Sequence, residues 1–173
     1  MLTIEKAADT EDFCAAHQLI AEMGAWDAEQ TEAHGASSDD MLATYYSDSV
    51  PILMTRFGVA GADLFLARED QETIGCVGFS GHADIAHVFK LYVRAPWRGR
   101  GVGGALMTAA LEGIQAAGYQ RARLVTTRFM PEAISLYRAV GFEDCPSFEA
   151  APGDLQDITV YMERSIARPR DLD

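Results

Sequence analysis

The spacing of apolar and polar residues at the start of the chain predicts a short strand and then a helix. Residues 2–7 alternate as a half-buried strand does. Over 10–23, apolar side chains recur three and four positions apart, which places them on one face of a helix. Asp9 or Thr10 can cap that helix, since either side chain accepts a hydrogen bond from a free amide of the first turn.

The stretch from 24 to 49 carries a weaker pattern. It predicts one short helix over 39–46, capped by Ser37 or Ser38. Its composition is equally compatible with a substrate-binding loop and with a segment that only packs against the rest of the domain.

Three runs of β-branched and aromatic residues follow at short spacing, as in consecutive strands. Residues 63–68 and 73–79 are separated by the polar turn 69–72, which predicts a hairpin. Residues 85–93 form the third run, and the proline-containing segment 95–97 ends it.

The clearest helix in the chain is predicted over 101–118. Its apolar side chains form one stripe, and Gly118 suits a C-terminal cap. A strand predicted over 122–126 follows. The region 85–126 is therefore expected to form a β-α-β unit with neighbouring parallel strands.

The last part of the chain predicts one more helix and one more strand. Pro131 fits the start of a helix over 132–140, and residues 157–162 alternate as a final strand. Residues 164–173 are typical of a frayed tail. This order of elements predicts an α+β, or mixed α/β, fold on a single sheet.

Length and composition are those of one globular domain. The chain has 173 residues, of which 49% are apolar and 23% are charged, as in globular rather than disordered proteins. We therefore expect one domain over 1–166 and a flexible tail over 167–173. The net charge of −12 argues against binding to nucleic acid or to an anionic membrane, since both need a basic face.

The cysteines and the apolar runs lead us to expect a cytoplasmic protein. Cys14, Cys76 and Cys145 have neither metal-ligand nor redox spacing, which predicts three reduced, mostly buried thiols and no metal site. The first residues lack the pattern of a signal peptide, and no apolar run approaches the roughly 18 residues of a membrane span.

The glycine-rich segment 98–104 carries the most informative chemistry. It follows a predicted strand and opens a predicted helix, and its four glycines let backbone amides converge on one point. Together with the helix dipole, these amides suit a phosphate or pyrophosphate. Arg94, Arg98 and Arg100 add positive charge nearby. The alternative is a tight turn with solvated arginines.

Two common phosphate-binding motifs fit this segment poorly. Gly99, Gly101 and Gly104 match the spacing of a dinucleotide fingerprint, but no acidic residue between 119 and 128 is present to hold a ribose. A P-loop would need Gly-Lys followed by Ser or Thr, which the sequence lacks. A nicotinamide-dependent enzyme is therefore a minor hypothesis.

The segment 91–106 resembles the acyl-CoA-binding motif of the GNAT superfamily of N-acyltransferases. The core pattern of that motif, Arg/Gln-x-x-Gly-x-Gly/Ala, corresponds here to Arg98, Gly101 and Gly103. A second block, 132–142, resembles the Ala-Ile-x-Leu-Tyr-x-x-x-Gly-Phe helix that follows in such enzymes. The resemblance implies a GNAT-like fold, with a central, mostly antiparallel twisted sheet flanked by helices.

The resemblance also implies that acetyl-CoA is the cosubstrate and that no metal is used. Backbone groups of Leu91, Tyr92 and Val93 would bind the pantetheine arm as an added strand. Amides of the glycine turn would hold the pyrophosphate, and an arginine would meet further phosphate charge. The implied residues of the turn are Arg98, Gly99, Arg100, Gly101, Val102, Gly103 and Gly104. Many members have Asn where Met130 stands, so Met130 is expected only to pack.

Acetyl transfer to an amine makes three demands on the site. The amine must lose a proton, since an alkylammonium with a pKa of about 10.4 is neutral in roughly one molecule in 2,500 at pH 7. The thioester carbonyl must be polarised, for which the Val93 amide is the candidate donor. The departing thiolate must gain a proton, and Tyr137 resembles the tyrosine often assigned that task. A buried core aromatic is the alternative interpretation of Tyr137.

The base is less well determined. Several relatives carry Glu a few residues before the end of the corresponding strand, and this chain has His87 there. Histidine, with an ordinary pKa near 6.5, could accept the proton directly or through water. A packed or exposed His87 is equally compatible with the sequence. His82 and Asp84 are further candidates, and a water chain without a dedicated base is another.

The sequence thus predicts an N-acetyltransferase that acetylates a primary amine of a small molecule or peptide, and analogy suggests a homodimer. The alternative is a CoA-binding sensor or interaction domain without catalysis, which Met130 and the missing Glu favour. The acidic net charge would attract a cationic amine. Either an acceptor pocket or a solvated, packed segment would account for a group of aromatic and acidic residues: Trp26, Glu29, Glu32, Asp39, Asp40, Tyr45 and Tyr46.

Overall fold

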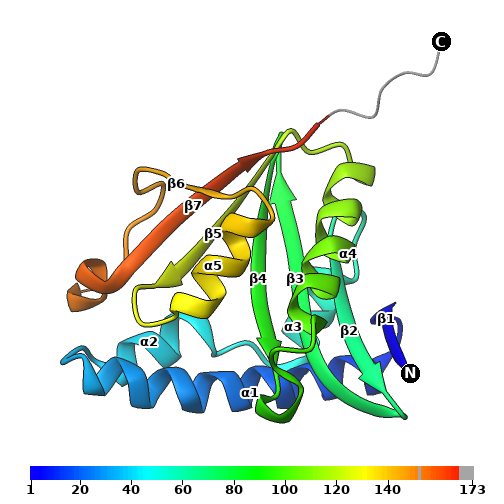
Figure 1. The fold of residues 1–173 in the computed structure, drawn as a ribbon, viewed down its shortest axis with the longest axis horizontal. Coiled ribbons are helices and arrows are strands. Elements are labelled where there is room, and N and C mark those ends of the chain that lie inside the picture. Colours follow the sequence, from blue (N-terminus) through cyan, green and yellow to red (C-terminus); the bar gives the residue numbers. More distant parts are fainter. Residues whose placement is uncertain (152, 168–173) are drawn as a thin grey trace.

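The computed structural model describes residues 1–151 and 153–167, and these form one seven-stranded sheet flanked by helices (Figure 1). The strands lie in the order β1-β2-β3-β4-β5-β7-β6. Their bounds are β1 Leu2–Lys6, β2 Asp63–Glu69, β3 Glu72–His82, β4 Ile85–Val93, β5 Arg121–Thr127, β6 Glu143–Asp144 and β7 Thr159–Ser165. Only β4 and β5 are parallel neighbours among these described strands. The predicted α+β class and mostly antiparallel sheet are confirmed.

Two helices cover one face of the sheet. α4 (Val102–Ala116) connects the parallel strands β4 and β5, which confirms the predicted β-α-β unit. It packs on the sheet beside α5 (Pro131–Ala139) (Figure 1). Leu106 of α4 and Tyr137 of α5 join Phe79 of β3 in the larger apolar core.

The opposite face of the sheet is covered by α1 (Thr10–Ala33) and α3 (Val50–Phe57). Leu64 and Leu66 of β2 pack against these helices, whereas Phe65 between them packs on the α4 side. Alternate side chains of the strand therefore enter two cores. Burial of both faces explains why β2 is a continuous apolar run rather than an alternating one.

α2 (Ser38–Tyr45) forms where the sequence predicts a helix. Ser37 caps it, because the Ser37 hydroxyl accepts a hydrogen bond from the backbone amide of Asp40. Met41 of α2 packs with Leu155 of the short 3₁₀ turn Gly153–Ile158. This small third apolar cluster packs the segment that precedes β7 against α2.

α1 continues to Ala33, whereas the sequence pattern predicted an end at 23. The buried residues of its second half are Gly24, Asp27 and Thr31. These residues are small or polar, so the apolar period fades although the inner face of the helix stays buried. Gly24 is required by close packing, because an added Cβ would lie 3.1 Å from the ring of Tyr46.

The sequence analysis also missed α3 and ended the last strand too early. β7 runs to Ser165, so a tail beginning at 164 is wrong for the first two residues. Arg164 pairs with Ala122 in the ladder, and its guanidinium donates to the carbonyl of Val140 at 2.6 Å. The expected tail, 167–173, lies outside the described residues except for Ala167, and the single domain over 1–166 stays a prediction.

The three cysteines have different environments. Cys76 is buried, Cys145 is partly buried and Cys14 is exposed on α1, and all three are free thiols. The expectation of mostly buried thiols is therefore wrong for Cys14, which lies on the outer face of its helix. In the described part of the chain, every helix is too short or too polar to cross a membrane.

Candidate active site

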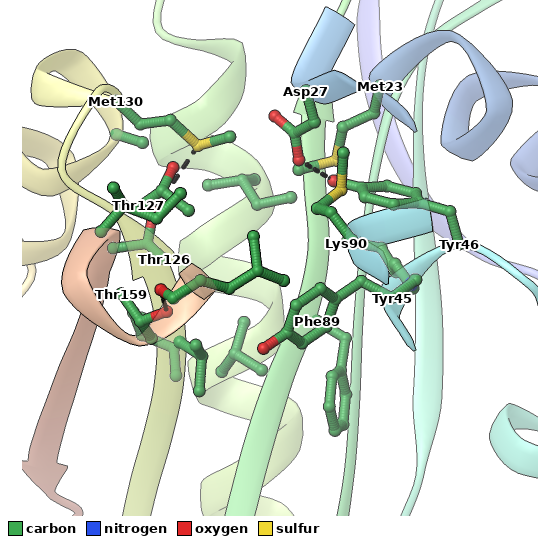
Figure 2. A pocket seen from close by; sticks show the side chains of 18 of the residues that line it. Met23, Asp27, Tyr45, Tyr46, Phe89, Lys90, Thr126, Thr127, Met130 and Thr159 are labelled. Carbon is green, nitrogen blue, oxygen red and sulfur yellow. Dashed lines mark hydrogen bonds between the residues drawn. The ribbon is translucent and has the colours of Figure 1, made fainter. Parts of the chain in front are cut away.

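β4 and β5 separate shortly after they pair. The parallel ladder joins only Ile85–His87 to Arg121–Arg123. Further along β4, Val77 of β3 faces two residues, Lys90 and Leu91, and Lys90 has a positive φ of 60°. An extra residue of this kind bends and twists its strand. The bend carries the end of β4 away from β5, and a cavity lies between the two strands (Figure 2).

A groove of about 920 Å³ runs from the end of β4 across the start of α4 to the start of α5. Nine of the ten residues predicted to bind the cosubstrate line it, namely Leu91, Tyr92, Val93, Arg98, Gly99, Gly101, Val102, Gly103 and Gly104. The tenth, Arg100, does not line the groove. The opposite wall is formed by Met23 and Trp26 of α1 and by Phe129 and Met130. Sequence reasoning did not name Met23 or Phe129, and it had placed Trp26 in a possible acceptor pocket and given Met130 only a packing role.

The glycine turn presents backbone rather than side chains to the groove. Gly99 and Gly101 have φ of 72° and 82°, a region that other residues avoid, and Gly101 is the N-cap of α4. The first amides of α4 have no partners within the helix, and the helix dipole favours an anion beside them. An added Cβ on Gly104 would meet nothing within 4 Å. A diphosphate can therefore approach the main chain closely here.

Two of the three arginines near the turn are already paired with carboxylates. Arg94 lies 2.7 Å from Glu22 and 3.0 Å from Glu72. Arg100 lies 3.1 Å from Glu69. The expected concentration of positive charge is thus reduced, because surface acids on neighbouring elements neutralise it.

Arg98 differs from these two arginines. Its Nε donates to the carbonyl of Val93 at 2.8 Å, and its guanidinium lies over the ring of Tyr92. Arg98 lines the groove. Its charge is therefore held at the rim of the groove by the end of β4.

A smaller cavity of about 150 Å³ continues inward from the groove. Figure 2 shows Thr126 and Thr127 of β5 on one side of it and Asp27 and Tyr46 on the other. The groove and the cavity share five lining residues, Met23, Leu91, Phe129, Met130 and Ala133. We call this shared region the junction. A ligand in the groove can reach the cavity through the junction.

Asp27 is a buried carboxylate on the α1 wall of the cavity, with 6% of its surface exposed. The hydroxyl of Tyr46 donates to its Oδ2. The Lys90 ammonium lies 4.7 Å from the centre of the Tyr46 ring and donates to the Tyr45 carbonyl. Burial raises the pKa of Asp27 to about 6, although the Tyr46 hydrogen bond and the Lys90 charge lower it. The carboxyl therefore changes charge within an ordinary working pH range.

Three buried polar atoms along the cavity lack hydrogen-bond partners among the described residues. They are Oδ1 of Asp27, Oγ1 of Thr31 and Oγ1 of Thr127. Buried polar atoms without partners are rare and each needs an explanation. Here they lie on opposite walls of one space, from α1 and from β5, which is the arrangement expected of a polar ligand site.

Tyr137, the predicted acid, lies on the α5 wall of the cavity and is 8% exposed. Its ring packs edge-on against Phe142, with ring centres 6.2 Å apart. Burial, and then the charge of Asp27, raise the pKa of its hydroxyl. The phenol is therefore protonated at neutral pH, as a proton donor must be. Its catalytic role stays a prediction.

His87, the predicted base, also lines the cavity. Its ring stacks near Phe89 at 6.1 Å and meets Phe148 edge-on at 5.6 Å. Partial burial lowers the pKa of the imidazole, Glu149 raises it, and Arg123 lowers it further. The imidazole is therefore able to accept a proton when it is neutral. The role of His87 as the base stays a prediction.

The structure places only some of the other residues named from the sequence beside the groove or the cavity. Tyr45 and Tyr46 line the cavity and Trp26 lines the groove. His82, Asp84 and the carboxylates Glu29, Glu32, Asp39 and Asp40 line neither space. The segment before α3 therefore supplies aromatic walls, while its acidic residues lie elsewhere; Glu32, for instance, accepts a hydrogen bond from Ser38.

The sequence analysis missed Asp27, Thr31, Lys90 and Thr127. The available signal on α1 was the four-residue spacing of Met23, Asp27 and Thr31, which places them on one helix face. Among residues 1–151 and 153–167, no group of three or more His, Cys, Asp and Glu side chains could hold a metal ion.

Known proteins resemble this chain in sequence and in fold. A family model described as an acetyltransferase (GNAT) domain matches residues 60–144. The uncharacterized N-acetyltransferase YjgM of Escherichia coli is 32% identical over 118 residues, which are 66% of this chain and 71% of that protein. Mycothiol acetyltransferase of Streptomyces avermitilis is 37% identical over 83 residues, 47% of this chain but 27% of that longer protein.

A solved structure extends the likeness to nearly the whole chain. PaiA N-acetyltransferase from Thermoplasma acidophilum, in complex with coenzyme A, superposes with a TM-score of 0.72 at 20% identity. The match covers 95% of this chain and 99% of that one. At this identity the likeness concerns the fold.

Proposed function

Because the chain belongs to the GNAT superfamily of N-acetyltransferases, and is thus an acyltransferase, we propose that it moves the acetyl group of acetyl-CoA to a primary amine of a small molecule. The observation that carries this proposal is the continuity of the long groove with the smaller inner cavity. A narrow thioester arm fits the first space, and a compact acceptor fits the second.

Acetyl-CoA is assigned to the groove by the chemistry of its walls. The glycine turn offers backbone amides and a helix N-terminus to the pyrophosphate. The separated end of β4, over Leu91–Val93, offers main-chain groups to the pantetheine amides, as an added strand would use them. The similar fold of PaiA, which was solved with coenzyme A, supports the same assignment.

Residues on the groove side and the cavity side of the junction supply the groups that the reaction needs. We assign polarisation of the thioester carbonyl to the backbone amide of Val93, which lines the groove. The Tyr137 hydroxyl is assigned to protonate the leaving thiolate. Its raised pKa keeps it protonated until it is used. His87, which lines the inner cavity, is the base that the sequence suggested.

A small acceptor is favoured over a large one by the size of the cavity. A volume of about 150 Å³ is similar to that of cavities that hold a single benzene ring. A protein substrate would insert no more than one terminal residue into such a space. A compact small molecule would fit within it beside the reacting thioester.

The test is acetylation of a panel of amines with acetyl-CoA. Product mass and CoA release should rise together with at least one primary amine, and titration should show binding of acetyl-CoA. Binding of acetyl-CoA without acetylation of any amine would instead indicate a CoA-binding sensor, the alternative that Met130 suggested. CoA release should be followed chromatographically, because the exposed Cys14 would react with thiol reagents.

A further inference from the structure

We propose that Asp27 binds the ammonium group of the acceptor and takes its proton, and that the inner cavity selects compact primary amines with a largely apolar body. This inference rests on the proposed acetyl transfer and adds the base and the acceptor class. The sequence analysis did not name Asp27 as a functional residue.

The position of Asp27 on α1 places it just beyond the junction. Met23, Asp27 and Thr31 follow each other at four-residue intervals, so they lie in one row about 6 Å apart along the helix. Met23 lines both the groove and the cavity, whereas Asp27 and Thr31 line the cavity alone. A thioester that ends at the junction therefore has Asp27 one helical turn further in.

One oxygen of Asp27 is held and the other is available. Tyr46 donates to Oδ2, while Oδ1 is buried and without a partner among the described residues. Figure 2 shows the Tyr46 hydroxyl directed at the carboxylate from one side of the cavity. Leaving a charged oxygen unpaired in the interior is unfavourable, and an incoming ammonium would remove that penalty.

The charged and titratable groups around Asp27 do not supply that cation. Lys90 of β4 acts on Asp27 through its charge, but its ammonium already donates to the Tyr45 carbonyl and lies over the Tyr46 ring. Tyr46, directly after α2, and Tyr137 of α5 are neutral at pH 7, because burial raises the pKa of both hydroxyls. The ammonium of the acceptor would therefore complete the pairing of this buried carboxylate.

The proton transfers balance without a further reactant. The ammonium gives one proton to the Asp27 carboxylate, and the neutral nitrogen then forms the C–N bond as the C–S bond breaks. Tyr137 gives its hydroxyl proton to the CoA thiolate. Amide formation then releases a second proton from the nitrogen, and this proton reprotonates Tyr137. Asp27 returns its proton to solvent. With a pKa of about 6, Asp27 is ionised at pH 7 and yet basic enough to accept a proton transiently.

The remaining walls of the cavity indicate the body of the acceptor. Met41, Leu124, Leu155 and Ile158 contribute apolar surface, while Thr31 and Thr127 each leave a hydroxyl oxygen unpaired. A six-carbon ring or chain fits the volume, and one neutral hydroxyl or ether could reach a threonine. Glu149, an exposed residue, is the other carboxylate that lines the cavity, so a second ammonium elsewhere along these apolar walls would be buried without a partner at large cost.

His87 lies further from the junction than Asp27 does. It precedes Leu91 by four residues on β4, which is at most about 13 Å of strand and is shortened by the bend at Lys90. Asp27 follows Met23 by only one helical turn. Direct proton transfer from an amine at the thioester is therefore geometrically easier to Asp27 than to His87.

The first experiment compares Asp27→Asn with Glu29→Gln, which removes one charge from an exposed position on the same helix. Benzylamine, 2-phenylethylamine and hexylamine are the compact probes. We expect kcat/KM for these amines to fall about 100-fold in Asp27→Asn, since positioned bases contribute factors of this size. The affinity for acetyl-CoA should stay within twofold, and Glu29→Gln should behave as wild type.

A second variant, Tyr46→Phe, keeps the carboxylate and removes the hydrogen bond that lowers its pKa. The acidic limb of the wild-type kcat/KM profile should lie near pH 6 and move to higher pH in Tyr46→Phe. A merely structural role for Asp27 would not produce this shift. An acidic limb that persists in Asp27→Asn and disappears in His87→Gln would overturn the proposal and return the role to His87.

The outcomes also separate this inference from the proposed function. If the wild-type protein does not bind acetyl-CoA or acetylates no amine, the proposed function fails. If it acetylates spermidine, kanamycin or a tetrapeptide but none of the three compact probes, the proposed function survives and this inference is overturned.

Discussion

Gly101 and Gly118 stand at the two ends of α4 with nearly the same backbone conformation, φ of 82° and 85°. An added Cβ would meet nothing within 4 Å at either position. Replacing either glycine with alanine would therefore strain the backbone to a similar extent. Only Gly101 lines the groove.

We expect Gly101→Ala and Gly118→Ala to lower the free energy of unfolding by a similar amount, about 1–2 kcal/mol each, because both force alanine to a positive φ. Only Gly101→Ala should weaken acetyl-CoA binding, by about tenfold, because it disturbs the amides at the helix start. Calorimetric titration and chemical unfolding measure the two effects. Equal acetyl-CoA affinity in both variants would remove the glycine turn from the binding site.

Tyr137→Phe should lower kcat by about 100-fold and leave acetyl-CoA affinity unchanged, because Tyr137 lines the inner cavity but not the groove. Stability should change by less than about 0.5 kcal/mol, since the structure shows no hydrogen bond from this hydroxyl among the described residues. Tyr119→Phe is the matched control. It loses a 2.7 Å hydrogen bond to the Gly61 carbonyl and should cost about 1 kcal/mol without affecting turnover.

Asp27→Asn should stabilise the protein at neutral pH. The native pKa of about 6 exceeds the ordinary 3.8, so the folded state binds a proton that the unfolded state has already lost between these values. Stability is therefore lost as pH rises from 4 to 6 and stays reduced above that, by on the order of 2–3 kcal/mol. Asparagine is neutral and can still accept from Tyr46.

Unfolding in urea at several pH values tests whether Asp27→Asn raises the free energy of unfolding. The difference between Asp27→Asn and wild type should be largest above pH 7 and shrink toward zero below pH 4. A variant that is less stable than wild type at pH 7.5 would show that the carboxylate holds the fold together and is not a cost borne for function.

The three thiols should react with iodoacetamide in a fixed order. Cys14 is exposed and should be alkylated first. Cys145 should follow slowly, because partial burial raises the pKa of its thiol. Cys76 should react only on unfolding, since burial raises its pKa to about 12. Peptide mass spectrometry after short exposures measures the order, and rapid labelling of Cys76 in the native protein would contradict its placement in the core.

Much of the fold was predictable because its cues are local. The β-α-β unit around α4 was evident from an apolar strand, a glycine turn and a long apolar stripe that are contiguous in the chain. Prediction failed where local cues were weak. The second half of α1 carries Gly24, Asp27 and Thr31 on its buried face, so no apolar period marked it as helix.

The candidate site also has a part that local cues predicted and a part that they did not. Nine of the ten residues that the resemblance to the GNAT motif implied line the groove, since the strand end and the glycine turn are contiguous in the chain, and their binding role stays a prediction. The pairing of Arg94 with Glu22 and of Arg100 with Glu69 was not predictable, because each pair joins elements distant in sequence.

The sequence by itself determined the class of fold, most of the strands and helices in their order, and the place of the glycine turn, because these follow from side-chain spacing and backbone preference within short segments. Only the tertiary structure decided that Asp27, Tyr46 and Lys90 would meet across a cavity from Thr127. These residues come from α1, the end of α2, a bend in β4 and the far end of β5. A carboxylate gains its raised pKa and its unpaired oxygen from burial among such distant neighbours, and no local pattern encodes that environment.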